Sequence, residues 1–119
     1  MAVSWTEHKD KKILYVDYRG CKNDDELLKV LQEHIDIEKK APSGLLVLAN
    51  YTGAYVGLHY MQEVKKYGQE LRKSKSPRTG VVGVDGLKKL AFSGYMAFTG
   101  DKNTKAFDSE NEAKDWLVS

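Results

Sequence analysis

Apolar and polar side chains alternate over the first twenty residues in the way that two short strands do. Residues 3–6 and 11–20 are rich in the β-branched and aromatic side chains that suit strands, and a polar segment separates them. This pattern predicts a β-hairpin at the start of the chain.

The apolar spacing then changes to that of a helix. Across residues 23–40, apolar side chains recur three and four positions apart, and Asn23 and Glu26 have the spacing of a capping box. A strand is predicted at residues 45–50, where the unbroken apolar run 45–49 is typical of a strand covered on both faces, as in a parallel sheet. We therefore predict a helix and then a buried strand.

The same alternation continues after residue 50. Helical spacing returns at residues 60–71, and a short buried strand is predicted at residues 79–84. Asp85 can cap a third helix, which Gly100 would close.

The chain ends with a predicted strand at residues 104–107 and a helix at residues 108–117, where Ser109 and Glu112 form a second possible capping box. The element order is therefore ββαβαβαβα. This alternation predicts an α/β fold with a mixed, mostly parallel five-stranded sheet and four helices. At 119 residues, we expect residues 1–119 to form a single domain around one core.

The turn after the third predicted strand is the first candidate site. Small α/β domains bind ligands and partners at the carboxyl ends of their parallel strands, and this turn lies at that end. The candidate regulatory or ligand-binding loop consists of Asn50, Tyr51, Thr52, Gly53 and Tyr55. The Thr52 hydroxyl is expected either to cap the turn or a helix, or to be a phosphorylation site.

Three segments of the sequence carry a family resemblance. Residues 50–53 (NYTG) follow the third strand. Residues 80–89 (GVVGVDGLKK) cover most of the fourth strand and the start of the next helix, and residues 107–117 (FDSENEAKDWL) lie near the end of the chain. This arrangement resembles the STAS-like family. It is similar to the anti-sigma factor antagonist fold and is often grouped with CRAL-TRIO lipid-binding domains.

The resemblance also covers the candidate loop. In the antagonist branch, the loop after the third strand carries an aspartate, then two residues later a phosphorylatable serine, then glycine. The residues at the similar positions here are Asn50, Thr52 and Gly53. Thr52 keeps a hydroxyl, whereas Asn50 replaces the acid with a neutral amide that can still hydrogen-bond the turn.

Composition limits the cellular setting. Apolar residues make up 41% of the chain and charged residues 30%, which is ordinary for a globular protein. The longest apolar run, residues 45–49, is too short to cross a bilayer, and the N-terminus lacks the apolar segment of a signal peptide. Together with the single Cys21, these features predict a cytoplasmic protein without a transmembrane segment.

Charge is concentrated in the middle of the chain. Residues 60–105 carry 10 basic and 4 acidic groups, or +6, although the whole chain carries only +2. Such a segment can steer an acidic partner, or it can be a solvated surface. It lacks the interleaved aromatic residues of a nucleic-acid module, so we predict no nucleic-acid partner.

No residue spacing indicates catalysis, a metal or a cofactor. His8, His34 and His59 fall on different elements without metal-ligand spacing. No serine, histidine and acid combination can be recognised, so we predict that the protein is not an enzyme.

The glycines of the fourth strand have the spacing GxxGxxG. Gly80, Gly83 and Gly86 match neither the dinucleotide fingerprint nor a Walker A loop. We interpret them as sites of close packing and of a tight turn from strand to helix.

The third helix is the second candidate site. At about 100 degrees per residue, its inward face is expected to hold Leu87, Leu90, Ala91, Gly94 and Phe98. Phe92 and Met96 would then lie on the far side, beside Lys88 and Lys89. This exposed patch could be a partner surface, a lip over an apolar ligand, a patch that enters a membrane interface, or a set of scattered surface hydrophobes.

Two functions remain open from the sequence. The first is a non-catalytic regulatory or protein-interaction module that uses the loop and the third helix, with another protein or a second copy of the chain as partner. The second is a carrier of a small apolar ligand or lipid, suggested by the CRAL-TRIO grouping and by Tyr51, Tyr55 and Phe92. A pocket for a whole lipid is difficult to fit into a chain of this length.

Overall fold

The computed structural model describes residues 2–75, 77–100 and 102–119. In chain order the elements are β1 (Val3–His8), β2 (Lys11–Asp17), α1 (Asp24–Lys40), β3 (Leu46–Asn50), α2 (Leu58–Lys75), β4 (Arg78–Val82), α3 (Gly86–Thr99), β5 (Thr104–Phe107) and α4 (Glu110–Val118). This order confirms the predicted alternation of strands and helices.

The strands form a five-stranded sheet in the order β1-β2-β3-β4-β5. β1 and β2 pair antiparallel as the predicted hairpin, and its turn residues Lys9 and Asp10 have positive φ values. The pairs β2–β3, β3–β4 and β4–β5 are parallel. The carboxyl ends of β2 to β5 therefore share one edge of the sheet, called here the carboxyl edge.

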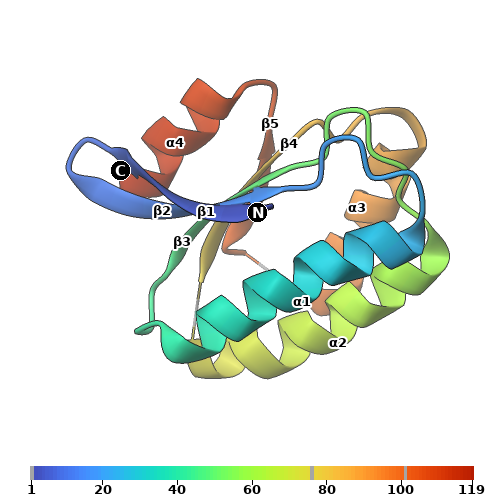
Figure 1. Cartoon of the computed structure of the whole chain (residues 1–119), viewed down its shortest axis with the longest axis horizontal. Coiled ribbons are helices and arrows are strands. Elements are labelled where there is room, and N and C mark those ends of the chain that lie inside the picture. Colours follow the sequence, from blue (N-terminus) through green and yellow to red (C-terminus); the bar gives the residue numbers. More distant parts are fainter. Residues whose placement is uncertain (1, 76, 101) are drawn as a thin grey trace.

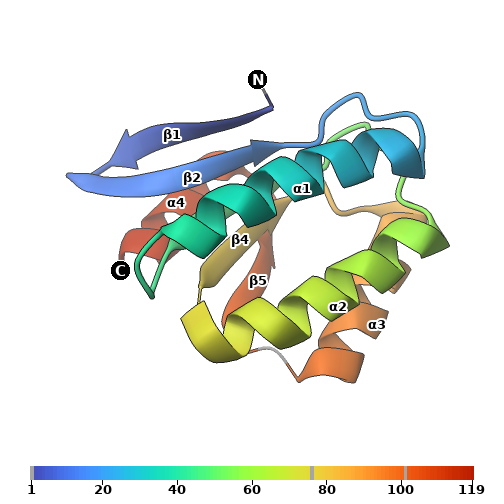
Figure 2. The same cartoon turned by 60° about the horizontal axis from the view of Figure 1, so that its bottom comes forward.

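The helices lie in two layers, one on each face of the sheet (Figures 1 and 2). α1, α2 and α3 cover one face, and α4 covers the other. We call these the three-helix face and the α4 face. The sheet is therefore covered on both sides, as the unbroken apolar run of β3 predicts.

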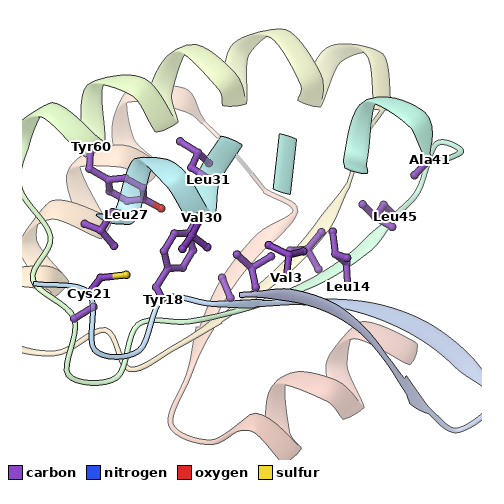
Figure 3. Close-up of a cluster of buried hydrophobic side chains, with 14 residues drawn as sticks. Val3, Leu14, Tyr18, Cys21, Leu27, Val30, Leu31, Ala41, Leu45 and Tyr60 are labelled. Carbon is purple, nitrogen blue, oxygen red and sulfur yellow. The ribbon is translucent and has the colours of Figure 1, made fainter. Parts of the chain in front are cut away.

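Alternate residues of the central strands supply a separate core to each face. In β3, Val47 belongs to the core of the three-helix face, part of which is shown in Figure 3, and Leu48 belongs to the core of the α4 face. The buried members of the α4-face core are Ile13, Leu48, Val82, Ala113 and Leu117.

The two layers differ in how closely they approach the sheet. α4 packs directly on β3 and β4, and it does so because Gly80 has no side chain: a Cβ on Gly80 would lie 3.1 Å from the Ala113 Cβ. This contact confirms the predicted close packing at Gly80. By contrast, α2 packs more against α1 and α3 than against any strand.

Local sequence signals set the ends of the helices. The Asn23 side chain accepts a hydrogen bond from the Glu26 backbone nitrogen at 3.0 Å, and Ser109 accepts one from Glu112 at 3.3 Å, which confirms both predicted helix starts. Gly100 ends α3 in the left-handed conformation, with φ of 65°. Asp85 precedes α3 but makes no side-chain capping bond, so that part of the prediction was wrong.

The predicted facing of α3 was also wrong. Leu90 is 71% exposed and Gly94 is exposed, although both were expected to face inward. Tyr95 is buried, and Phe92 is partly buried instead of lying on an outer face. The side chains of Leu87 and Phe98 lie outside the described part of the structure.

The physical reason for this error is the composition of α3. Apolar residues occur on more than one side of this helix, so their spacing does not identify a single inward stripe. The inward side is instead set by the aromatic residues Phe92 and Tyr95, which are larger than the leucine and glycine that were expected there.

Candidate functional site

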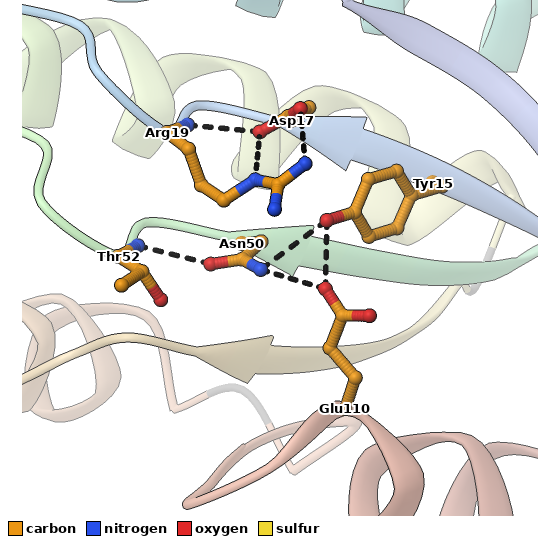
Figure 4. Close-up of polar contacts among 6 residues, drawn as sticks. All are labelled: Tyr15, Asp17, Arg19, Asn50, Thr52 and Glu110. Carbon is orange, nitrogen blue, oxygen red and sulfur yellow. Dashed lines mark hydrogen bonds and ion pairs between the residues drawn. The ribbon is translucent and has the colours of Figure 1, made fainter.

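The loop after β3 begins at a buried amide on the α4 face. Asn50 ends β3 and is 5% exposed. Its Oδ1 accepts a hydrogen bond from the Thr52 backbone nitrogen at 2.9 Å, and its Nδ2 donates to Glu110 Oε2 at 2.6 Å and to the Tyr15 hydroxyl at 3.2 Å (Figure 4). Both ends of the amide are therefore used, one to form the turn and the other to anchor it.

The anchor of this turn is a polar network of Tyr15, Asn50 and Glu110. The Tyr15 hydroxyl donates to Glu110 Oε2 at 2.7 Å, so one carboxylate oxygen receives two hydrogen bonds. Burial, reinforced by the hydrogen bond to Glu110, raises the pKa of Tyr15 to about 12. The network therefore joins β2, β3 and the first residue of α4 on the α4 face.

An ion pair lies next to this network at the end of β2. Arg19 Nε and Nη2 donate to the two oxygens of Asp17 at 2.9 and 3.0 Å (Figure 4). The hydrogen bond from Arg19 lowers the pKa of Asp17. Both residues are more exposed than Asn50, so they form the outer part of the polar surface at the carboxyl edge.

The next residue in the loop faces the other side of the sheet. The Tyr51 ring stacks on Tyr18, with centroids 4.5 Å apart and planes within 4°, and its hydroxyl lies 2.7 Å from the Tyr60 hydroxyl. Its carbonyl accepts a hydrogen bond from Lys88 Nζ at 3.0 Å. Burial raises the pKa of Tyr51 to about 12. Tyr51 is thus fixed by α2, α3 and the segment after β2.

The tip of the loop is exposed, but its base is closely packed. Thr52 and Gly53 are exposed, and the Tyr55 side chain is 58% exposed. Gly83, at φ of 79°, passes so close that a Cβ there would lie 2.3 Å from the Thr52 nitrogen. This contact confirms the tight turn predicted at Gly83 and restricts the position of Thr52.

The structure assigns the turn-forming role to Asn50, whose amide was expected to be able to hydrogen-bond the turn, and not to Thr52. In the described part of the chain, no hydrogen bond from the Thr52 hydroxyl holds the turn or a helix end, and the Asn50 side chain holds the turn instead. The expected capping role of Thr52 was therefore wrong. Its hydroxyl is left at an exposed position between two fixed neighbours, Tyr51 and Gly83.

A cavity of about 90 Å³, called here the inner cavity, lies between the sheet and the three-helix layer. Its wall includes five tyrosines: Tyr18, Tyr51, Tyr60, Tyr67 and Tyr95. Lys88 and Phe92 of α3 also line it. Of the residues first considered for an apolar ligand, Tyr51 and Phe92 thus reach the cavity, whereas Tyr55 faces solvent.

The four residues proposed as an interface on α3 do not share one exposed face. Lys89 is exposed, Met96 is partly buried, and the Lys88 side chain is only 14% exposed. Since Lys88 and Phe92 line the inner cavity, they belong to its wall and not to an outer patch.

A buried polar cluster lies beside the inner cavity. His34 Nε2 is 2.8 Å from Glu38 Oε1 and 3.1 Å from the Tyr67 hydroxyl. Burial, followed by the Glu38 carboxylate, raises the pKa of Tyr67 well above its ordinary value. This cluster joins α1 to α2 through Glu38 Oε1, whereas the buried Glu38 Oε2 has no hydrogen-bond partner among the described residues.

The described residues contain neither a metal-binding cluster nor a membrane-spanning helix. Among them, no group of three or more histidine, cysteine, aspartate and glutamate side chains is arranged to hold a metal ion. No helix in the described part of the chain is long and apolar enough to span a membrane.

Sequence reasoning missed the polar network and the tyrosine cluster. Tyr15 and Glu110 are 95 positions apart, so no local spacing connects them. One usable signal was strand parity, because Tyr15 and Leu14 must point to opposite faces of β2. The placement of Tyr18 and Tyr60 around Tyr51 depends on how α2 packs, which local patterns do not report.

Comparison with known proteins identifies the fold. No family model and no curated protein matches the chain. An uncharacterised DUF3478 protein with a SpoIIAA-like fold from Shewanella loihica PV-4 superposes with a TM-score of 0.65 at 21% identity, over 98% of this chain and 92% of that one. An anti-sigma-factor antagonist (STAS) domain protein from Planctomyces limnophilus gives a TM-score of 0.67 at 8% identity, over 98% of both chains.

These two similarities confirm the predicted fold, and they do not show the grouping with CRAL-TRIO domains, so the lipid-binding expectation gains no support from them. The chain therefore has the α/β fold shared by STAS domains and SpoIIAA-like proteins.

Proposed function

We propose that this chain is a non-catalytic regulatory module that binds a protein partner through the loop Asn50–Tyr55 at the carboxyl edge. The observation that carries the proposal is the contrast within this loop. Asn50 is buried and makes three side-chain hydrogen bonds, whereas Thr52, Gly53 and Tyr55 are exposed. A fixed base with an exposed tip is suited to recognition, because little conformational entropy is lost on binding.

Exposed apolar side chains beside the loop support a protein as the partner. Tyr55 is 58% exposed and Leu58, the first residue of α2, is 75% exposed. Aromatic residues are enriched in protein interfaces, and neighbouring apolar area adds to the surface that a partner can bury. Leu90, which is 71% exposed on α3, and Lys89 beside it extend the candidate surface in place of Phe92 and Met96.

The similar STAS protein is described as an anti-sigma-factor antagonist. We extend only the general mode of action to this chain. Our proposal leaves open whether the partner is another protein or a second copy of the chain. Light scattering after size-exclusion chromatography distinguishes these, since self-association doubles the mass. A cytoplasmic location remains the prediction made from the sequence.

Thr52 is the residue proposed to regulate this binding. Its side chain is exposed, and a phosphate there would add ~1.5 to 2 negative charges at the loop tip. Lys88 lies close by, since its Nζ donates to the Tyr51 carbonyl. The added charge would change the docking surface without requiring a new fold.

Substitution of Thr52 tests this proposal. Because its hydroxyl does not hold the turn, Thr52→Ala is expected to change the free energy of unfolding by less than about 0.5 kcal/mol and to retain partner binding. Thr52→Glu is expected to fold equally well but to recover much less partner in purification from native cells. Equal recovery with both variants, or no phosphorylated fraction of the natural protein in intact-mass analysis across growth conditions, would remove the switch from the proposal.

A further inference from the structure

The inner cavity results from the way the three helices pack. α2 packs against α1 and α3 more than against the strands, and a cavity of about 90 Å³ remains between these helices and the sheet. Protein interiors contain few voids larger than a water molecule. The inner cavity is smaller than an engineered cavity of about 150 Å³ that accommodates benzene, so a single ring is the upper limit of what it can hold and would enter only with small movements of the wall.

One wall of the inner cavity is a rigid aromatic surface. Tyr18 stacks on Tyr51 and meets the edge of Tyr60, with centroids 5.6 Å apart and planes at 69°. Tyr18 and Tyr60 are each 1% exposed, and the hydroxyl of Tyr60 is bonded to that of Tyr51. Rings fixed in this way favour stacking or edge contact with another aromatic group.

A cationic side chain also faces the inner cavity. The Lys88 side chain is 14% exposed and lines the cavity, and its Nζ contacts the Tyr51 carbonyl at 3.0 Å and Asp85 Oδ1 at 3.4 Å. The Asp85 side chain is 86% exposed, so its charge is largely screened by solvent. A carboxylate brought into the cavity would meet Lys88 in a drier environment, where such a pair is stronger.

We propose that the inner cavity binds a small aromatic carboxylic acid. Its ring would lie against the tyrosine wall, and its carboxylate would pair with the Lys88 ammonium group. The cavity volume sets a single ring as the upper limit, which excludes a lipid, and leaves the short acidic side chain at the partly exposed Lys88. His34 and Tyr67, which also line the cavity, are hydrogen-bonded to each other and to Glu38, so their polar atoms already have partners.

Ligand binding would also affect the proposed docking loop. Tyr51 belongs both to the cavity wall and to the loop, and its carbonyl is the acceptor for Lys88. A carboxylate that draws Lys88 away would therefore release one contact of Tyr51, next to Thr52. This regulatory step rests on the function proposed above, whereas binding of the acid does not.

Isothermal titration of the purified chain with phenylacetate tests the binding, with 2-phenylethanol as the uncharged control. Phenylacetate is expected to bind saturably and about tenfold more tightly, as one charge-assisted contact can supply. Lys88→Met should remove that difference, Lys88→Arg should keep most of it, and the exposed control Lys89→Met should leave it unchanged. Melting temperatures of all three variants verify that they fold.

Two results would overturn the binding proposal: no saturable binding of phenylacetate, or an unchanged preference for it in Lys88→Met. Amide chemical shifts then test the coupling to the loop. We expect phenylacetate to shift the amides of Tyr51, Thr52 and Gly53 but not that of Ser43, which lies between α1 and β3. Binding without shifts in the loop would overturn the regulatory step alone, and partner docking by the loop is tested separately with no ligand present.

Discussion

The two faces of the sheet meet the same carboxyl edge in different ways. On the α4 face, Asn50 is held by Tyr15 and Glu110 beneath a helix that packs directly on β3 and β4. On the three-helix face, the adjacent Tyr51 is held by other aromatic side chains beside a cavity. Two consecutive residues thus connect the loop to two different layers. On one face the helix packs directly on the sheet, and on the other a cavity remains between the helices and the sheet.

The difference follows from the side chains that lie between the sheet and its helices. Gly80 lets α4 approach so closely that a Cβ at that position would lie 3.1 Å from the Ala113 Cβ, which is shorter than an ordinary contact. On the other face, Tyr18 and Tyr60 occupy the space below the helices, and large rigid rings leave gaps that small flexible side chains would close. We therefore expect the α4 face to provide stability and the three-helix face to provide adaptability.

The largest effect is expected from alkaline pH. The pKa of Tyr51 and of Tyr15 is raised from 10.0 to about 12, so the folded protein holds these protons more tightly than the unfolded chain does. The stability that they contribute is complete below pH 10 and is lost as the pH rises towards about 12. The buried Tyr18 and Tyr60, whose pKa values burial also raises well above the ordinary value, add to this loss.

Tyrosinate absorbance and near-ultraviolet circular dichroism, recorded together across this pH range, check the expectation. The buried tyrosines should ionise only as the tertiary signal disappears, and Tyr51→Phe should make the loss of stability with pH less steep. Ionisation of all tyrosines in a protein that keeps its full tertiary signal would contradict the account of both faces.

The next largest effect is expected at the contact between Gly83 and the loop. Gly83→Ala is expected to destabilise the protein by about 3 kcal/mol, because the new Cβ would meet the Thr52 backbone and the φ of 79° is unfavourable for alanine. Gly20→Ala is the matched control, since Gly20 has the same φ of 79° with open space around it. It should cost only about 1 kcal/mol. Urea denaturation measures the free energy of unfolding of both variants. An equal decrease in the two would show that the close contact with Thr52 does not contribute to the cost.

Asn50→Asp tests the role of the amide at the end of β3. The amide nitrogen donates to Glu110 at 2.6 Å, so an aspartate would place a second carboxylate against the first. We expect a loss of about 2 kcal/mol at neutral pH, which becomes smaller as the pH falls and one of the pair is protonated. The second substitution Glu110→Gln should restore most of the stability, and a double variant as unstable as Asn50→Asp alone would contradict this explanation.

The smallest effect compares neighbouring valines on the two faces of β4. Val81 lines the inner cavity, whereas Val82 belongs to the closely packed core of the α4 face. Val81→Ile is expected to be neutral or to stabilise by up to about 1 kcal/mol, because the added methylene can enter the cavity. Val82→Ile is expected to destabilise by about 1 kcal/mol through overpacking. Thermal unfolding measures the stability of both variants. If Val82→Ile were more stable than Val81→Ile, the inner cavity could not accommodate the added methylene.

The sequence predicted the features of this fold that depend on near neighbours. The helix starts at Asn23 and Ser109 follow from side chains that bond a backbone nitrogen three residues later, and Gly100 follows from its tolerance of positive φ. The strands followed from their apolar runs and the hairpin from alternation. These signals are complete within one element, so they were sufficient for the element order and the sheet.

The candidate site was only partly predictable, because its contacts join distant parts of the chain. The loop Asn50–Tyr55 was recognised from its position after a buried strand, but Glu110 holds Asn50 from 60 residues away. The inward side of α3 depends on the tyrosine cluster that it faces, so local periodicity selected Leu90 where the structure buries Tyr95. The inner cavity depends on helix packing, which no single segment encodes.

The central claim is that the exposed tip of the loop is the surface that a partner binds, and site-specific photo-crosslinking in native cells tests it most directly. A photoreactive residue is placed at Tyr55, at the carboxyl edge, or at Ser43, which is also exposed but precedes β3 at the opposite edge. We predict a discrete crosslinked protein from position 55, reduced by the additional change Thr52→Glu, and none from position 43. Crosslinking that is equal at both positions, or confined to position 43, would contradict the claim.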